Sequence, residues 1–227
     1  MTRIAAVTGL ASEAEVLRAA ADAGGLELTV RAAGADPERT ETTAAELLNA
    51  APDVLVSFGL AGALSAALAP GDALLPEAVV DPDGTRWPAD RAWHDAVGAA
   101  HGRGAVSGDL AGSDTAVATP RDKIALGERT GAVAVDMESH RVARAAHRGG
   151  VPWIALRAVS DPAGRGVPPA LLDLVGPEGG VRWQRLPRAL LHPRALRALA
   201  RDSRTAHATL DRLAAALARA AHHLRKS

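Results

Sequence analysis

The chain alternates short apolar runs with segments of helical spacing over most of its length, and this alternation limits the folds open to it. The apolar runs predict buried strands at residues 4–7, 26–31, 53–58, 72–80, 132–135 and 153–159. The helical segments between them are residues 12–23, 40–50, 120–129 and 138–148. The alternation predicts an α/β fold with three layers, a mostly parallel central sheet flanked by helices on both faces. Residues 85–104 are expected to be irregular, and residues 161–181, rich in Pro and Gly, to form a loop.

The C-terminal part of the chain differs from the rest in charge and in periodicity. Residues 182–227 hold 11 basic and 2 acidic side chains, whereas residues 1–181 hold 15 basic and 24 acidic ones. From Leu196 to Leu224, mostly leucine and alanine recur at intervals of three and four residues. This spacing predicts a long helix with a narrow apolar seam and arginines on its other faces. Residues 185–227 are therefore expected to form a basic amphipathic helical extension.

Composition disfavours several classes of function. The chain has no cysteine, so disulfides and thiolate metal sites are excluded, and its eight histidines show no metal-binding spacing. We expect neither a metal nor an organic cofactor. No apolar run approaches the roughly 20 residues of a membrane-spanning helix, and the first predicted strand follows no signal peptide, so the cytoplasm is the expected compartment. The acidic charge of residues 1–181 and the scarcity of aromatic side chains, five in the whole chain, disfavour nucleic-acid binding.

Three acidic residues, Glu13, Glu138 and Asp161, each follow a predicted strand. Ligands of open α/β sheets bind beyond the carboxyl ends of the strands. We therefore expect the three carboxylates to converge on one cleft, together with the glycine-bearing segment 59–62. Acidic residues also favour helix N-termini for electrostatic reasons alone, so their positions are consistent with helix caps too.

Three segments resemble, in this order and spacing, the nucleoside phosphorylase and nucleosidase superfamily: residues 56–64 (VSFGLAGAL), 134–138 (AVDME) and 156–161 (LRAVSD). Residues 4–13 are similar to the methylthioadenosine/S-adenosylhomocysteine nucleosidase branch, and the resemblance extends over residues 2–165. The chain is most similar to the hopanoid-associated phosphorylase subfamily, on residues 110–114, 136–140 and 199–204. The resemblance implies a nucleoside phosphorylase-like catalytic domain at residues 1–184.

Members of that subfamily remove adenine from adenosylhopane and leave a ribosyl-hopanoid, so the resemblance implies cleavage of an adenine N-ribosyl bond in hopanoid biosynthesis. It implies that Asp161 is the general acid that protonates N7 of the purine. It also implies that Glu138 binds the ribose 2′- and 3′-hydroxyls and that Glu13 activates the attacking water. General acid catalysis typically contributes about 10²–10⁴ in rate, but a solvated aspartate holds no proton at neutral pH.

The same resemblance implies further residues around the sugar. The implied substrate-binding set is Ala61, Gly62, Asp136, Met137, Arg157 and Ser160. Met137 would pack against the ribose, and Ala61 and Gly62 would let the backbone approach it closely. Ser160 and Arg157 would position the loop that carries the general acid.

The chain departs from the phosphorylases of the superfamily at the phosphate site. Those enzymes hold phosphate with an Arg before the glycine segment and a Ser inside it, where this chain has Ser57-Phe58 and Leu60. Glu13 would also repel a phosphate dianion. We therefore favour hydrolysis over phosphorolysis, in which phosphate would be the co-substrate. A methylthioadenosine/S-adenosylhomocysteine or futalosine nucleosidase is a competing hypothesis, and so is a non-catalytic purine or lipid carrier, which would have no need for a proton donor.

Other features of the binding site stay open. Trp87, Trp93 or an apolar residue near Leu110 could stack on the purine, although all four tryptophans are by default expected in the core or an interface. The acid that contacts the purine loop is either Asp109 or Asp114. For a hydrocarbon attached at the ribose 5′ position, an apolar pocket mouth is expected. Its candidate contributors are Leu60, Leu64 and Leu68.

Partners follow from the same considerations. The expected ligand is a lipid-linked nucleoside, and a homo-oligomer is expected because relatives form one. His140 is expected on a helix surface or at an interface. The C-terminal helix could dock on its own domain or a partner subunit, lie on the inner membrane face as a peripheral contact, or bind nucleic acid, the least favoured of the three.

Overall fold

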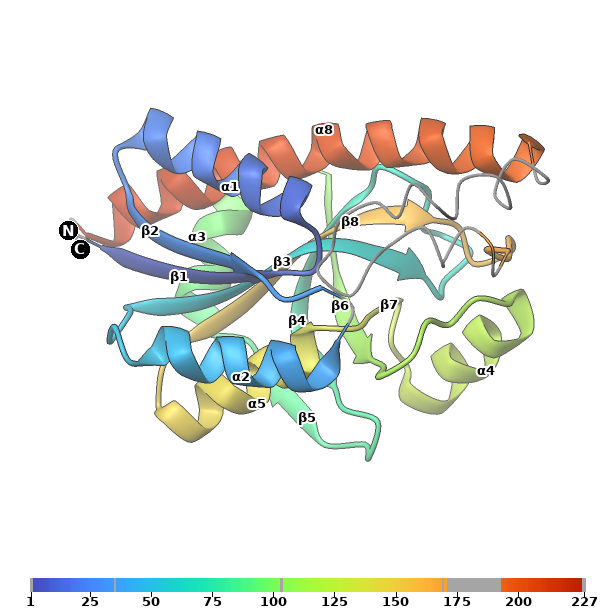
Figure 1. The fold of residues 1–227 in the computed structure, drawn as a ribbon, viewed down its shortest axis with the longest axis horizontal. Helices are drawn as coiled ribbons and strands as arrows, with labels where there is room; N and C mark the ends of the chain where they lie inside the picture. The colour runs from blue at the N-terminus through green and yellow to red at the C-terminus, as the bar shows by residue number, and fades with distance from the viewer. Residues whose placement is uncertain (1, 35, 103, 169, 171–192, 226–227) are drawn as a thin grey trace.

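The computed structural model describes residues 2–34, 36–102, 104–168, 170 and 193–225 (Figure 1). Its strands are β1 (Arg3–Thr8), β2 (Glu27–Ala32), β3 (Val54–Ala63), β4 (Ala73–Val80), β5 (Arg86–Pro88), β6 (Ala105–Gly112), β7 (Ala134–Asp136) and β8 (Trp153–Asp161). Its helices are α1 (Ala11–Gly24), α2 (Pro37–Leu48), α3 (Arg91–His101), α4 (Pro120–Thr130), α5 (Ser139–Gly149) and α8 (Pro193–Leu224). Most of the loop expected at 161–181, and Trp183, lie outside the described residues.

The expected α/β fold, with a sheet between two layers of helices, is confirmed. The four expected helices of the domain are present within a few residues of their expected bounds, and the helical extension expected at 185–227 is present as α8 over the part of it that the structure describes. Among α1, α2, α4 and α5, the largest difference at a helix start is in α2, which begins at Pro37 rather than at residue 40. The Asp36 side chain accepts a hydrogen bond from the Arg39 backbone N–H and so caps the helix, with Pro37 in its first turn.

The expectation of irregular structure at residues 85–104 is wrong. This stretch forms β5 and α3, and Asp90 caps α3 by accepting a hydrogen bond from the Trp93 backbone N–H. Trp93 and Val97 are the buried residues of α3, so the apolar signal is one turn long. The next strand, β6, was not expected either, because Ser107, Gly108 and Asp109 interrupt its apolar pattern.

The strands form one mixed sheet in the order β2-β1-β3-β7-β6-β4-β5, and β8 pairs with both β3 and β4. Strands β3, β8, β4, β6 and β7 are thus linked in a closed ring. Five strand pairs are parallel, whereas β3–β7, β4–β5 and β4–β8 are antiparallel. The antiparallel β3–β7 pair sets Val135 beside Gly62, so the end of β7 runs back toward the middle of β3.

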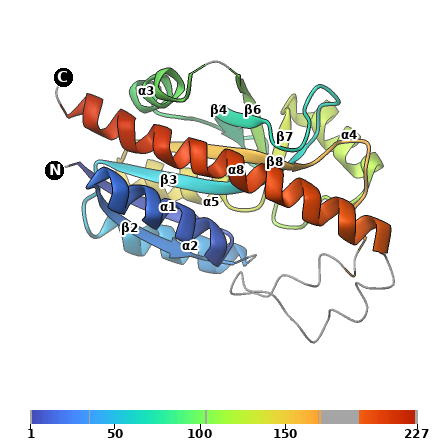
Figure 2. The ribbon, with the colours of Figure 1, turned by 90° about the horizontal axis from the view of Figure 1, so that it is seen from above.

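Two helical layers cover the sheet (Figures 1 and 2). Helices α1, α3 and α8 pack on one face, where Leu17, Phe58 and Leu213 belong to one apolar cluster. Helices α2 and α5 pack on the other face, around a second cluster that includes Leu47 and Val142. Helix α4 lies at one end of the sheet, beside β6.

Helix α8 runs along the whole length of its face of the sheet (Figure 2). Its apolar seam is present as expected: Ala206, Leu210, Leu213 and Leu217 are buried, and the helix packs against α1, α3 and β8. The seam therefore docks on the domain of its own chain, while contacts of the remaining faces with a partner or a membrane stay predictions. Within the described residues, no helix combines the length and apolarity that crossing a membrane requires.

Substituting the seam of α8 tests its contribution to stability. Leu213 is fully buried, so Leu213→Ala removes apolar contacts and leaves a cavity. The free energy of unfolding should fall by about 2–5 kcal/mol, measured by urea unfolding. Arg204→Ala, at an exposed position of the same helix, should change it by less than about 0.5 kcal/mol. Equal effects of the two substitutions would contradict this packing.

Candidate active site

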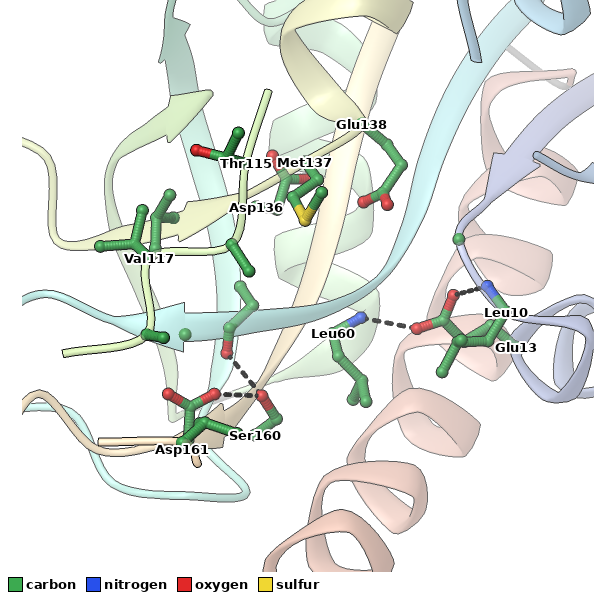
Figure 3. Close-up of a pocket in the computed structure, with 17 residues that line it drawn as sticks. Leu10, Glu13, Leu60, Thr115, Val117, Asp136, Met137, Glu138, Ser160 and Asp161 are labelled. Carbon is green, nitrogen blue, oxygen red and sulfur yellow. Dashed lines mark hydrogen bonds between the residues drawn. The ribbon is translucent and has the colours of Figure 1, made fainter. Parts of the chain in front are cut away.

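A pocket of about 210 Å³ lies where the ends of β1, β3 and β8 meet the junction of β7 and α5. Its walls are the Gly9–Leu10 turn, the second half of β3, residues 115–118 and the end of β8 (Figure 3). Strands β1, β3 and β8 are mutually parallel through β3, so their carboxyl ends share one edge of the sheet. This is the position where ligands of such sheets bind.

The three acids predicted from the sequence all line this pocket. Glu13 comes from the first turn of α1, Glu138 is the residue before α5, and Asp161 ends β8. Glu13 and Glu138 lie on the side of the pocket near β1, and Asp161 lies across from them (Figure 3). The predicted convergence on one cleft is confirmed, whereas the chemical role of each acid stays a prediction.

Glu13 is almost completely buried, with 2% of its surface exposed. Its carboxylate accepts hydrogen bonds from the backbone N–H groups of Leu10, at 2.8 Å, and Leu60, at 2.9 Å. Burial raises the pKa of Glu13 above its ordinary value, while these two bonds and the charge of Arg157 oppose the rise. A Cβ on Gly59 would lie 2.7 Å from both Glu13 oxygens, so this carboxylate requires a glycine in β3.

Glu138 lies beside Glu13 in the same part of the pocket. A Cβ on Gly9 would approach the Glu138 carboxylate to 2.8 Å and that of Glu13 to 3.6 Å, so both acids face this turn. Burial raises the pKa of Glu138 to about 8, and the charge of Asp136 adds to the rise. Glu138 therefore carries a proton at neutral pH in the unliganded protein.

Arg157 lies beneath these acids, with its side chain 1% exposed. Its Nη2 forms an ion pair with Asp136 and donates to the hydroxyls of Ser57, at 2.6 Å, and Ser139, at 2.9 Å. Oε2 of Glu138 lies 3.8 Å from the same nitrogen. Arg157 is not among the residues that line the pocket, and these contacts are to the Glu138 side of the site rather than to the Asp161 loop as the sequence had suggested.

Asp161 is held by contacts to both of its oxygens. The Ser160 hydroxyl lies 2.7 Å from Oδ1, and the same hydroxyl lies 3.2 Å from the carbonyl oxygen of Ala61. Oδ2 pairs with the ammonium of Lys123. A Cβ on Gly62 would come within 3.2 Å of Oδ2, so the carboxylate lies close against the β3 backbone.

Lys123 is a site residue that the sequence analysis missed. It lies on α4, 1% exposed, and its Nζ also lies 3.0 Å from the carbonyl oxygen of Pro162 and 3.3 Å from that of Arg165. A signal for it exists in the sequence. Lys123 precedes Leu126 by three residues on the buried side of α4, where a lysine without a partner would be costly.

Several candidates for contacts with the base and the 5′ group lie elsewhere. Trp87 bonds to Asp81, while Trp93 and Leu110 belong to the apolar cores. None of these three side chains lines the pocket. Of the candidates for the apolar mouth, Leu60 lines the pocket, but Leu64 and Leu68 are buried in core clusters. Trp153 is in the core as expected.

Neither proposed acid of the purine loop contacts the pocket. Asp109 forms a bidentate ion pair with Arg86, at 2.7 and 2.8 Å. Asp114 pairs with Arg141 and lies 2.9 Å from Nε2 of His140. The expectation of a surface position for His140 is wrong, because its side chain is fully buried. Among the described residues, no group of three or more His, Cys, Asp or Glu is suited to a metal.

The raised pKa of Glu138 makes stability depend on pH. The native state keeps a proton on Glu138 up to about pH 8, whereas the unfolded chain loses it near pH 4.5. The stabilisation is complete below the lower value and is lost as the pH rises through the higher one. The free energy of unfolding should therefore fall by about 2–3 kcal/mol between pH 6 and pH 9. Urea unfolding should show this slope reduced in Glu138→Gln and unchanged in Glu15→Gln, an exposed acid of α1; an unchanged slope in Glu138→Gln would contradict the assignment.

Comparison with solved structures finds the same fold in proteins of low sequence identity. The 5′-methylthioadenosine/S-adenosylhomocysteine nucleosidase of Neisseria meningitidis, in complex with methylthio-immucillin-A, has a TM-score of 0.76 at 18% identity, over 96% of this chain and 98% of that chain. The S-adenosylhomocysteine nucleosidase of Streptococcus pyogenes has a TM-score of 0.65 at 22% identity, over 72% and 85%. A futalosine hydrolase mutant of Helicobacter pylori has a TM-score of 0.66 at 18% identity, over 72% and 87%.

Comparison with family models gives a more specific result than the solved structures of low sequence identity. A search of curated protein sequences finds no match, but the family model described as the phosphorylase superfamily matches residues 19–191. This confirms at the superfamily level the expected enzyme class, an N-glycosyl hydrolase or a nucleoside phosphorylase, while the hopanoid-associated subfamily stays a prediction. With three quarters of its length matched by that model, the chain belongs to the phosphorylase superfamily.

Proposed function

We propose that this protein is a purine nucleosidase that hydrolyses the bond between adenine and ribose. The observation that carries the proposal is the meeting of Glu13, Glu138 and Asp161 in one pocket at the carboxyl edge of the sheet. Cleavage of such a bond passes through a ribosyl cation and a departing purine anion. It therefore needs an acid at the base, negative charge at the sugar and a base for the attacking water, and three carboxylates can fill these three roles.

Asp161 is proposed as the acid that protonates N7 of the purine. It lies across the pocket from Glu13 and Glu138 (Figure 3). If the ribose lies beside those two acids, the purine extends toward Asp161, which is where a proton donor to N7 has to be. Ser160 holds Oδ1 at 2.7 Å and fixes the direction of the carboxyl group. A non-catalytic carrier would have no use for this arrangement.

Glu138 is proposed to bind the ribose hydroxyls and to stabilise the cation. In the unliganded pocket its pKa of about 8 keeps it protonated. Hydroxyl donors and a developing positive charge favour the ionised form, so the substrate itself supplies the conditions under which Glu138 becomes an anion. Met137, which lines the pocket next to it, would pack against the ribose.

Glu13 is proposed as the base that activates water. Its two backbone hydrogen bonds hold the carboxylate in place, and its raised pKa makes it a stronger base than a solvated carboxylate. Arg157 Nη1 has no hydrogen-bond partner among the described residues and points at Gly59 from the same side as Glu13.

Charge favours hydrolysis over phosphorolysis. None of the described residues that line the pocket is a lysine or an arginine, whereas four of them are acids. The two cations nearest to them, Lys123 and Arg157, are engaged by Asp161 and Asp136. A phosphate dianion would meet negative charge without an available partner, while water meets no such barrier. Phosphorolysis remains the second candidate because the family contains phosphorylases.

The substrate is proposed to be adenosylhopane, on the resemblance to the hopanoid-associated subfamily. Leu10, Leu60, Val117 and Val167 give the pocket apolar walls, which suit a hydrocarbon at the ribose 5′ position. Methylthioadenosine, S-adenosylhomocysteine and futalosine are the competing substrates, because solved structures of this fold include nucleosidases named for them. On the same resemblance we propose a cytoplasmic homo-oligomer that needs no cofactor.

The substitution Asp161→Asn tests the role of Asp161 as the acid that protonates the purine. Asp161→Asn keeps the size of the side chain but has no proton to give, so kcat for adenine release should fall by about 10²–10⁴. The substitution also leaves the buried ammonium of Lys123 without its carboxylate, so the melting temperature should fall as well, and circular dichroism establishes that the variant is folded at the assay temperature. Asp109→Asn, which alters an acid outside the pocket, should keep activity close to that of the unmodified protein. Undiminished turnover by Asp161→Asn would remove this residue from its role.

A substrate panel tests the reaction. The purified protein is incubated with adenosylhopane, methylthioadenosine, S-adenosylhomocysteine and futalosine, with and without phosphate. We expect free base and a free ribosyl product at the same rate in both conditions, with adenosylhopane cleaved at the highest kcat/KM. Formation of a ribose 1-phosphate product would identify a phosphorylase instead, and absence of base release from every compound would contradict the proposed function.

A further inference from the structure

Lys123 is the buried cation of the site whose purpose the proposed chemistry leaves unexplained. An ammonium paired with Asp161 stabilises the carboxylate, yet Asp161 has to carry a proton in order to give one to the purine. We propose that Lys123 is the source of that proton and that Asp161 relays it to N7. This inference rests on the proposed function and adds a residue that acts through Asp161.

The geometry around Nζ matches an ammonium group. A lysine ammonium has three N–H donors and no acceptor, and Nζ has three oxygen neighbours: Oδ2 of Asp161 and the carbonyls of Pro162 and Arg165. Two of the three are backbone atoms of the loop that follows Asp161. Lys123 therefore holds both the carboxyl group and the loop that carries it.

The same loop is fixed from its other side by α8. Arg165 forms an ion pair with Asp202, which is 3% exposed and also pairs with Arg201 at 2.9 Å. The loop of Asp161 is thus held between Lys123 of α4 and Asp202 of α8. This arrangement keeps Oδ2 in contact with Nζ, as a direct proton transfer between them requires.

The choice of lysine is itself informative. Only two of the 26 basic residues in the chain are lysines, Lys123 and Lys226, and the rest are arginines. Arginine would serve equally well as a fixed charge, and it binds carboxylates more firmly, but its guanidinium does not lose a proton in proteins. A lysine ammonium, in contrast, can give up a proton. A chain built almost wholly with arginine has a lysine at the buried position that faces the proposed acid.

The proton moves from Lys123 to the purine in two steps. The Nζ–H bond breaks and an Oδ2–H bond forms, which leaves a neutral amine and a neutral carboxyl group. As the bond between ribose and adenine breaks, the carboxyl proton passes to N7, its O–H electrons stay on Asp161, and adenine leaves neutral. Water adds to C1′ and loses its proton to Glu13. Glu13 then releases this proton to solvent, and a proton from solvent restores the ammonium of Lys123.

The test compares Lys123→Arg, which retains the charge, with Lys123→Ala, which removes it. Both variants should lose at least about 100-fold in kcat for adenine release, within the range of general acid catalysis, while KM changes less than about threefold because Lys123 does not line the pocket. Arg121→Ala, at an exposed position of the same helix, is the matched control and should keep full activity. Circular dichroism and melting temperature establish that each variant is folded.

Small cations added to Lys123→Ala separate proton supply from charge. Methylammonium can occupy the space left by the side chain and give up a proton, and it should restore kcat at least about tenfold. Guanidinium carries the same charge and gives up none, so it should restore nothing. Equal rescue by both cations, no rescue by methylammonium, or activity of Lys123→Arg within tenfold of the unmodified protein would overturn the proposal. If the unmodified protein releases no adenine, the proposed function fails instead.

Discussion

The buried ion pair between Arg157 and Asp136 stabilises the side of the pocket that carries Glu13 and Glu138. The arrangement of the other site residues depends on this pair. It lies beneath Glu138 and Glu13, and without the positive charge of Arg157 the carboxylate of Asp136 would be buried beside two further acidic groups with no compensating cation. Removing one partner of a buried pair typically costs about 3–5 kcal/mol because it leaves an unpaired charge. The contacts of Arg157 with the hydroxyls of Ser57 and Ser139 tie β8 to β3 and to the start of α5.

Two electrostatic environments follow at the two ends of the pocket. At one end the desolvated acids Glu13 and Glu138 have raised pKa values and respond to whatever positive charge or hydroxyl donor arrives. At the other end Asp161 is paired with a buried ammonium. This pocket suits a ligand that develops positive charge beside Glu13 and Glu138 and accepts a proton at the end near Asp161. A nucleoside has this charge pattern while its N-glycosidic bond is being cleaved, because the ribose becomes cationic and the base takes up a proton.

The convergence of the three acids on one pocket was predictable from the sequence, but the reason given, that all three follow parallel strands, holds for only two of them. Glu13 and Asp161 follow β1 and β8, which run parallel to β3, as expected. Glu138 follows β7, which is antiparallel to β3, and it reaches the pocket because β7 pairs with Gly62 and Ala63 at the end of β3 and runs back toward the middle of that strand. The spacing of apolar residues indicates strands but contains no information on this pairing.

The remaining differences have the same origin in tertiary contacts. The single apolar turn of α3 and the polar residues of β6 gave too little periodicity to be assigned. Lys123 lies on the apolar side of α4, but only the packing of α4 against the end of β8 shows that its partner is Asp161. Leu64 and Leu68 were candidates for the apolar mouth of the pocket, but β3 ends at Ala63 and both side chains are buried in core clusters.

A crystal structure with a C-nucleoside analogue of adenosine, whose carbon–carbon glycosidic bond resists cleavage, tests the central claim most directly. The account predicts the sugar against Glu138, with both ribose hydroxyls within hydrogen-bond distance of its carboxylate, and N7 of the base at Asp161. It also predicts Glu13 on the side of C1′ from which water attacks. An analogue bound outside this pocket, or bound in it with its base toward Glu13 and its sugar toward Asp161, would contradict the account.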